Sequence, residues 1–336
     1  MSKKFISLLI LLAMTLSITV GNCSCSREND FSVKNRELAD EETLHFGNYE
    51  YMKYSDGTAV ITSYTGDAAS LTIPASFDGA DIVAIGSAAF AENTSLVSLT
   101  LPSTLEMIGD FAFYLCSSLA DVKFGNKLWS IGVSAFESTP WLASETDEYV
   151  VVGDNVLLKY QGSAHAVTVP KGIKHLADAF TMNSELISVE LPDTLLTIGV
   201  AAFSFCTELR HVCFGENLIL IGDGAFEGCE ALPAINIPDS VVSIGINAFR
   251  DCFYLTDIQF GSSLKEIGEY AFGGDVRIKI VSLPSSIELI DDNAFFDCFS
   301  LMYVFYDGTE DQFEDIQIYS SNYMLTSAYR ICNYRR

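Results

Sequence analysis

The chain has 336 residues, of which 49% are hydrophobic and 19% are charged. This length and composition allow a sizeable buried core, which excludes an intrinsically disordered protein. Acidic residues outnumber basic ones by 44 to 19, and the formal net charge is -25. Nucleic acids and anionic lipid surfaces attract positive charge, so neither is an expected partner.

Residues 1–22 are interpreted as a secretory signal peptide. Two lysines precede an apolar run at residues 5–20, which is short for a membrane span but suits an export signal. The alternative is an uncleaved anchor. The stretch "VGNCSC" that follows resembles a bacterial lipoprotein signal, with Cys23 as the candidate for lipid attachment, although Asn22 replaces the small residue usual before that cysteine. Residues 23–43 are polar and are expected to form a tether.

A phrase of the form IGxxAFxxC recurs through the chain. Its phenylalanine lies at Phe90, Phe113, Phe136, Phe180, Phe203, Phe226, Phe249, Phe272 and Phe295. Successive positions are 23 residues apart, except for one interval of 44 residues. A constant period of about 20–29 residues with leucine or isoleucine at set offsets is typical of a leucine-rich-repeat solenoid.

Each repeat opens with an alternating segment that predicts a β-strand. In "LVSLTLP", Leu99 and Leu101 are expected to point into the core and Thr100 outward. Proline or glycine follows each such strand. Proline suits a strand end because it lacks the N–H that would continue the hydrogen-bonded ladder. The following Ile-Gly pair predicts a short second strand, and the AFxxC segment predicts a helical turn. We therefore expect a right-handed leucine-rich-repeat solenoid, with parallel β-strands on one face and short strands or helical turns on the other.

Three residues after each repeated phenylalanine lies a small side chain, most often cysteine. The series is Asn93, Cys116, Thr139, Asn183, Cys206, Cys229, Cys252, Asp275 and Cys298. A donor at this position can satisfy a buried backbone group of a neighbouring coil. We expect these cysteines to be free, buried and structural, because a straight ladder lacks the close pairs of a tetrahedral zinc site. Asp275 predicts a local irregularity.

Two stretches that break the period have the alternation and turn residues of β-hairpins, at 49–66 and 149–162. The first is expected to cap the open end of the solenoid, since an uncovered edge invites aggregation. The second is expected as an insertion that restarts the array. We therefore predict two leucine-rich-repeat modules, 44–142 and 143–336, with a C-terminal cap from about residue 304.

These features together resemble the BspA-like surface leucine-rich-repeat family. They are the proline after the strand, the IGxxAFxxC phrase, the 23-residue period, the hairpin "YVVVGDNVLLKYQG" and the ending "YDGTEDQFEDI". The resemblance covers roughly residues 44–336. It implies a bacterial surface or secreted protein, with adhesion to matrix proteins or to other cells as the associated activity; the repeat itself implies only a scaffold.

The sequence offers little for catalysis. None of the four histidines forms an HxxxH or HExxH pair, and the GxGxxG, GxxxxGK[ST] and GxSxG motifs are absent. The acidic segment "DGTEDQFED" lacks the spacing of a calcium loop and is interpreted as a solvated surface. No metal and no cofactor are expected.

The candidate ligand face is the outward side of the strands in the second module. Its candidate residues are Glu190, His211, Cys213, Asn236, Gln259, Tyr303 and Phe305. Tyr303 and Phe305 are apolar at positions expected to be exposed, so either the cap folds over them, which we favour, or they anchor a ligand.

Two catalytic hypotheses for this face have less support than ligand binding. Cys213, His211 and Glu190 contain the groups of a thiol nucleophile, but residues two apart on a strand lie about 7 Å apart and no oxyanion hole is visible. Asp121 and Glu190 could imitate the carboxylate pair of a glycosidase, but we expect them on rows two coils apart.

The sequence therefore predicts a non-enzymatic, monomeric binding protein that is secreted or held at the cell surface, with membrane attachment only through a lipid at Cys23. The expected partner is an extracellular protein or glycan. A glycan-capture module and, less favoured, a hydrolase of surface glycan or peptide are the alternatives.

Overall fold

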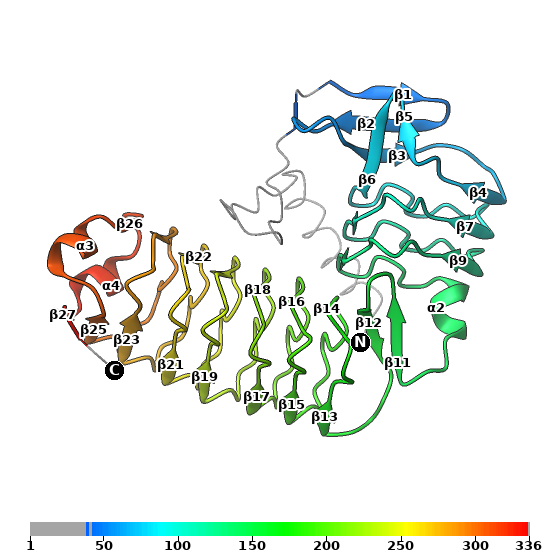
Figure 1. The fold of residues 1–336 in the computed structure, drawn as a ribbon. Helices are drawn as coiled ribbons and strands as arrows, with labels where there is room; N and C mark the ends of the chain where they lie inside the picture. Colours follow the sequence, from blue (N-terminus) through cyan, green and yellow to red (C-terminus); the bar gives the residue numbers. More distant parts are fainter. Residues whose placement is uncertain (1–37, 40–41, 335–336) are drawn as a thin grey trace.

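The computed structural model describes residues 38–39 and 42–334 (Figure 1). The expected signal peptide at 1–22, the lipid-attachment candidate Cys23 and most of the expected tether lie outside the described residues. Within the described chain, parallel strands stack into a solenoid, and the register advances by one repeat per coil: Ser188 pairs with His211, and Val189 with Val212. The predicted leucine-rich-repeat solenoid is confirmed.

The first stack of coils contains two sheets. One is formed by β1 (Leu44–Phe46), β2 (Tyr49–Lys53), β3 (Ala59–Tyr64), β6 (Ala80–Ile85), β8 (Met107–Ile108) and β10 (Ser130–Ile131), with β5 (Ser76–Phe77) against β6. The other is formed by β4 (Ser70–Thr72), β7 (Ser98–Thr100) and β9 (Asp121–Lys123). Helix α2 (Pro140–Ser144) follows the last coil and is capped by Thr139, whose hydroxyl accepts the N–H of Leu142.

The second stack has the same plan. Its short strands form one sheet of β11 (Tyr149–Val152), β12 (Val156–Tyr160), β14 (His175–Leu176), β16 (Thr197–Ile198), β18 (Leu220–Ile221), β20 (Ser243–Ile244), β22 (Glu266–Ile267), β24 (Leu289–Ile290) and β26 (Gln317–Ile318). Its longer strands are β13 (Ala166–Thr168), β15 (Ser188–Glu190), β17 (His211–Cys213), β19 (Ala234–Asn236), β21 (Asp257–Gln259), β23 (Ile280–Leu283), β25 (Tyr303–Tyr306) and β27 (Tyr329–Ile331). Helices α3 (Glu310–Glu314) and α4 (Tyr323–Ser327) lie near the C-terminal end.

The two segments expected to be hairpins hold antiparallel strand pairs, β2 with β3 and β11 with β12. Neither pair stands outside the solenoid. Strand β3 pairs in parallel with β6, and β12 pairs in parallel with β14, so each pair begins a short-strand sheet. Figure 1 shows the chain changing direction at β11 and β12, where the first stack gives way to the second.

The AFxxC segment is a run of turns, so the expectation of a helical turn is wrong. The physical reason is a positive φ two positions before the phenylalanine and again two positions after it; the coil of Phe180 has only the second, at Met182. In one coil these are Ala201, at 55°, and Phe205, at 57°. Left-handed residues at both places interrupt the right-handed backbone that a helix requires.

Phenylalanine rings form the axis of the core. From Phe180 to Phe295 the rings are stacked, with centroids of successive rings 5.0–5.4 Å apart. In the first stack, Phe113 lies between Phe90 and Phe136 at 4.9 and 5.1 Å. Each ring spans one coil, so a single substitution here opens a cavity between two neighbours.

The cysteine ladder is buried, and its members form no disulfides. Each thiol donates a hydrogen bond to the carbonyl of the phenylalanine in the preceding coil. The pairs are Cys116–Phe90, Cys206–Phe180, Cys229–Phe203, Cys252–Phe226 and Cys298–Phe272, with Sγ–O distances of 3.1–3.3 Å. The structural role predicted for these cysteines is therefore confirmed.

Candidate functional site

The outward side chains of β13, β15, β17, β19, β21, β23, β25 and β27 form one elongated surface, called the strand face below. Alternation along each strand points the first and third residues outward and the second toward the core. In β21, for example, Asp257 and Gln259 are exposed and Ile258 is buried. All seven candidate ligand residues lie at outward positions of this face, as the alternation predicted.

The strand face contains a depression of about 440 Å³ over β15, β17 and β19. It gathers four of the seven candidates, and its lining is Ser188, Val189, Glu190, Arg210, His211, Val212, Cys213, Pro233, Ala234 and Asn236. Gln259 is the direct neighbour of Asn236 on the next coil. Tyr303 and Phe305 lie farther along, on β25, and do not line the depression.

A proline explains the position of this depression. The ladder of long strands is interrupted between β17 and β19, which belong to separate sheets. Pro233 directly precedes β19 and has no N–H to donate to the coil before it. Here Val212 is half-buried, whereas Val189 and Ile235 at the equivalent positions of neighbouring coils are buried. The repeat pattern alone did not predict this break.

Glu190, His211 and Cys213, the residues of the thiol-nucleophile hypothesis, do not form a catalytic set. Glu190 is paired in register with Cys213, while His211 is paired with Ser188. Glu190 accepts a hydrogen bond from Thr168 Oγ1, at 3.1 Å, on the coil before it rather than from either partner. The glycosidase reading also fails on position, since Asp121 lies on β9 of the first stack and Glu190 on β15 of the second.

Tyr303 and Phe305 have different surroundings. Coverage by the C-terminal segment applies to Phe305, whereas Tyr303 stays exposed. The ring of Phe305 packs against Tyr334 at a centroid distance of 4.5 Å. Tyr303 remains 40% exposed and contacts Tyr329, which is 73% exposed, at 6.4 Å. The C-terminal segment therefore packs on Phe305 and leaves an exposed aromatic pair on the strand face. Sequence reasoning missed Tyr329, because it lies beyond the last repeat phrase.

Arginine side chains near this end are engaged within the chain. Arg277 lies over the ring of Tyr254, 4.1 Å from its centroid. Arg330 lies over Phe313 and forms ion pairs with the carboxylates of Glu310 and Glu314. Among the described residues, no group of three or more His, Cys, Asp or Glu side chains is placed to hold a metal ion.

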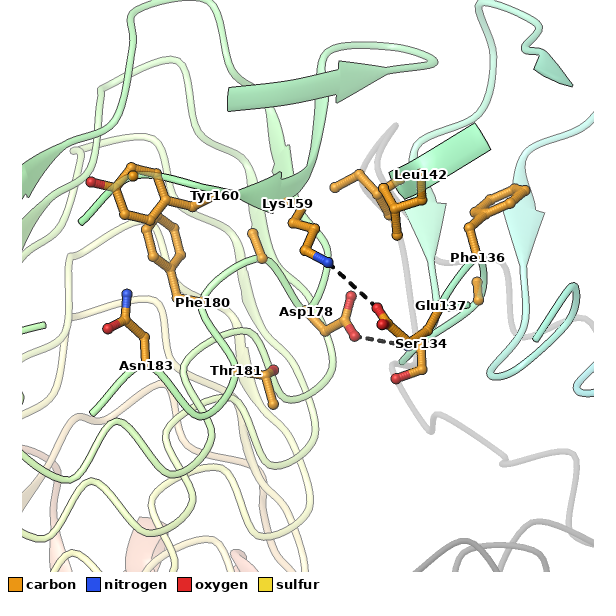
Figure 2. A pocket seen from close by; sticks show the side chains of 14 residues that line it. Ser134, Phe136, Glu137, Leu142, Lys159, Tyr160, Asp178, Phe180, Thr181 and Asn183 are labelled. Carbon is orange, nitrogen blue, oxygen red and sulfur yellow. Dashed lines mark hydrogen bonds and ion pairs between the residues drawn. The ribbon is translucent and has the colours of Figure 1, made fainter. Parts of the chain in front are cut away.

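A second depression, of about 380 Å³, lies where the two stacks meet (Figure 2). Asp178 reaches across it and accepts the N–H of Ser134 at 2.8 Å. Lys159 forms an ion pair with Glu137, with a nitrogen–oxygen distance of 3.5 Å. Burial raises the pKa of Asp178 to about 6, against the lowering effect of the hydrogen bond from Ser134. No sequence motif marks this pocket, because its two walls come from coils separated by the 44-residue interval.

A scan of protein families matches six copies of the BspA type leucine rich repeat region, over residues 64–146, 83–179 and 173–302. These ranges cover more than half of the chain. The chain belongs to the BspA-type leucine-rich-repeat family. No curated protein matches this BspA-type chain.

Several solved structures are similar to this BspA-type protein. A leucine-rich cell surface protein from Faecalibacterium prausnitzii is 24% identical, with 83% of this chain and 98% of that chain covered and a TM-score of 0.31. A leucine-rich-repeat protein from Bacteroides ovatus is 19% identical, with 86% and 99% covered and a TM-score of 0.31. The pneumococcal vaccine antigen PcpA is 16% identical, with 88% and 99% covered and a TM-score of 0.26. In the described part of the present chain, none of the helices has the length and apolar character needed to cross a bilayer.

Proposed function

We propose that this BspA-type protein is a non-enzymatic binding protein, secreted or held at the cell surface, that captures a macromolecule on the strand face of its second stack. The observation that supports this most is the gathering of Glu190, His211, Cys213 and Asn236 around one depression. The exposed pair Tyr303 and Tyr329 continues the same face toward its C-terminal end.

The shape of the face favours an extended protein or glycan over a small molecule. Small-molecule sites bury most of their ligand in a closed, largely apolar pocket, whereas this depression is wide and carries charged and amide side chains. Stacked coils fix the side chains in rows one repeat apart, such as Asn236 beside Gln259. Little side-chain and backbone freedom is then lost on binding.

Charge favours a partner with basic patches. The chain carries a formal net charge of -25. Glu190 and Asp257 are exposed on the strand face. Arg330, near its end, is paired with carboxylates of the same chain. Affinity should therefore fall with added salt, because exposed charges are screened over about 8–10 Å at physiological ionic strength.

The direct experiment is an unbiased pull-down with residues 27–336 from host extracellular proteins and polysaccharides, using the unaltered chain and a variant with Asn236→Arg and Gln259→Arg. These two residues are register partners on adjacent coils. The matched control carries Thr72→Arg and Thr100→Arg, which are register partners at the same outward position of the first stack. A ligand captured by the unaltered chain and the control, and lost by the Asn236 and Gln259 variant, supports the proposal. Equal capture by all three contradicts it.

A glycan-capture module is the second candidate, favoured by the exposed tyrosine pair, since aromatic rings offer flat apolar surface with a polar end. A glycan array separates this role from that of a protein adhesin. Turnover of glycosidase or peptidase substrates by purified residues 27–336 would instead revive the hydrolase reading, which the separation of Asp121 from Glu190 disfavours.

Attachment to the membrane is proposed to occur through lipid at Cys23, which lies outside the described residues. Labelled palmitate should enter the unaltered protein and not the Cys23→Ser variant. Incorporation into neither protein would leave simple secretion as the route of export.

A further inference from the structure

Adjacent coils are joined on the turn side by a ladder of backbone hydrogen bonds. In the coil before the junction, the N–H groups of Phe111, Phe113 and Leu115 donate to carbonyls of the next coil at 2.8–3.1 Å. The acceptors, Val133, Ala135 and Glu137, are alternate residues of one segment. The second stack repeats this arrangement, with Phe203 donating to Ala225 and Phe205 to Glu227.

This ladder stops at the junction between the stacks. The N–H of Ser134 donates to the side chain of Asp178 instead of a backbone carbonyl. The N–H groups of Phe136 and Ser138 have no acceptor among the residues that the structure describes. On the opposite wall, the carbonyl of Thr181 stands where the adjacent coils accept an N–H, and no donor to it is found in the described chain.

Phe136 and Thr181 line the depression between the stacks, and Ser138 is an exposed residue that directly follows the lining residue Glu137. Figure 2 shows Ser134 and Glu137 on one side, Phe180, Thr181 and Asn183 on the other, with Asp178 and Lys159 reaching between them. The β11–β12 pair explains the gap. Tyr160 of β12 occupies a place in the ring stack, 5.1 Å from Phe180, and its N–H donates to Ala179, but β12 contributes no turn segment of its own.

We propose that this pocket binds an extended polypeptide segment, which takes the place of the missing turn segment. Two carbonyls of the ligand, on alternate residues, accept the N–H groups of Phe136 and Ser138, and one of its N–H groups donates to the Thr181 carbonyl. Two donors at alternate residues of one segment, with an acceptor on the segment opposite, form the arrangement of a strand edge, which peptides complete by strand addition. The backbone of an extended peptide presents carbonyl groups on one side at every second residue, which matches the spacing of these donors. Small molecules and sugars have no such regular row of carbonyl groups.

The pocket has room for such a segment, with a volume of about 380 Å³. Its exposed lining is more polar than apolar, and its apolar members Phe136, Leu142, Leu158 and Tyr160 are buried. The ion pair between Lys159 and Glu137 crosses the gap, but its side chains are 40% and 50% exposed. Exposed pairs of this kind contribute little, so the ion pair opens at small cost when a peptide enters. This site is separate from the strand face and does not depend on its proposed function.

Amide hydrogen exchange on residues 27–336 tests the proposal. In the free chain, Phe136 and Ser138 should exchange at least about tenfold faster than Phe113 and Leu115. The probe is the peptide acetyl-Val-Ser-Ala-Phe-Glu-amide, which copies residues 133–137, the acceptor segment of the regular ladder. At millimolar concentration it should slow exchange at Phe136 and Ser138 by about tenfold or more and leave Phe203 and Phe205 unchanged.

Substitution provides the second arm. Glu137→Trp places a large ring at the pocket wall and should abolish the protection by the peptide. Its matched control is Glu227→Trp, at the same repeat position in a regular coil, which should retain the protection. Protection of Phe136 and Ser138 equal to that of Phe113 and Leu115 in the free chain overturns the proposal. So does an absence of slowing with the peptide, or slowing by maltohexaose and not by the peptide.

Discussion

Asp275 Oδ1 accepts the backbone N–H of Cys252 at 2.8 Å, although Asp275 occupies the position that cysteine holds in the coils on either side of it. A cysteine there donates to a phenylalanine carbonyl, whereas an ionised carboxylate can only accept. The side chain of Asp275 is fully buried, and its Oδ2 has no hydrogen-bond partner among the residues that the structure describes. Burial, with a smaller contribution from the charge of Asp251, raises the pKa of Asp275 well above its ordinary value.

Replacing this residue by the usual member of the ladder should stabilise the protein most at high pH. The folded chain raises the pKa of Asp275, so its contribution to stability is present at acid pH and is lost as pH rises through that folded pKa. Asp275→Cys should therefore increase the free energy of unfolding by about 1–3 kcal/mol at about pH 8, since an unpaired buried polar atom is removed. Denaturant unfolding measures this change. An increase in the free energy of unfolding that becomes larger as pH falls toward 4 would contradict this prediction.

Thiol reactivity should divide the cysteines by position. Burial raises the pKa of Cys206 to about 12 and of Cys229 well above its ordinary value, so neither provides a thiolate in the native protein. Cys213 is exposed on the strand face. In non-reduced protein, a thiol reagent should label Cys213 within minutes and label Cys206, Cys229 and Cys252 only after unfolding. Disulfides among ladder cysteines in the purified protein would show that the stacking is wrong.

His175 should make the second stack sensitive to acid. It is buried on β14, its Nδ1 lies 2.9 Å from Thr197 Oγ1, and burial lowers its pKa to about 4. The unfolded chain binds a proton near pH 6.5, so stability is complete above that value and falls as pH drops from about 6.5 to 4, by about 3 kcal/mol in all. His175→Gln should remove this part of the acid dependence. An unchanged pH profile of unfolding in that variant would contradict the assignment.

The exposed aromatic pair should contribute to ligand affinity. Removing both rings with Tyr303→Ala and Tyr329→Ala should weaken binding of the captured ligand by about tenfold or more, the scale expected for aromatic contacts at an interface. Both side chains are exposed, so the melting temperature should change little. The control is Tyr323→Ala on α4, which is 69% exposed and not part of the strand face. Equal losses in the pair variant and the control would place the ligand elsewhere.

The repeat made most of the fold predictable. A constant period forces equivalent residues into register, so the alternation in "LVSLTLP" was sufficient to place Leu99 inside and Thr100 outside. The same logic placed the cysteine ladder. The conformation of the turn was not predictable in this way, because non-glycine residues such as Ala201 and Phe205 carry no sequence signal of a positive φ.

The candidate sites were predictable only where the repeat continues. The outward positions from Glu190 to Gln259 follow from strand alternation. The break at Pro233 and the junction pocket arise where a coil lacks a donor or a turn segment, and Tyr329 lies beyond the last repeat. The break and the pocket exist because a neighbouring coil lacks a hydrogen-bond donor or a turn segment. A sequence pattern within one repeat does not reveal such a missing group.

The most direct test of the strand face is the affinity of the captured ligand, measured by calorimetry or surface plasmon resonance, for three chains. These are the unaltered residues 27–336, the variant with Asn236→Arg and Gln259→Arg, and the control with Thr72→Arg and Thr100→Arg. Both variants exchange two neutral register partners for arginine on adjacent strands. We predict loss of measurable binding in the first variant, with binding by the control and the unaltered chain alike that weakens as salt is added. Undiminished binding by the Asn236 and Gln259 variant would contradict the account.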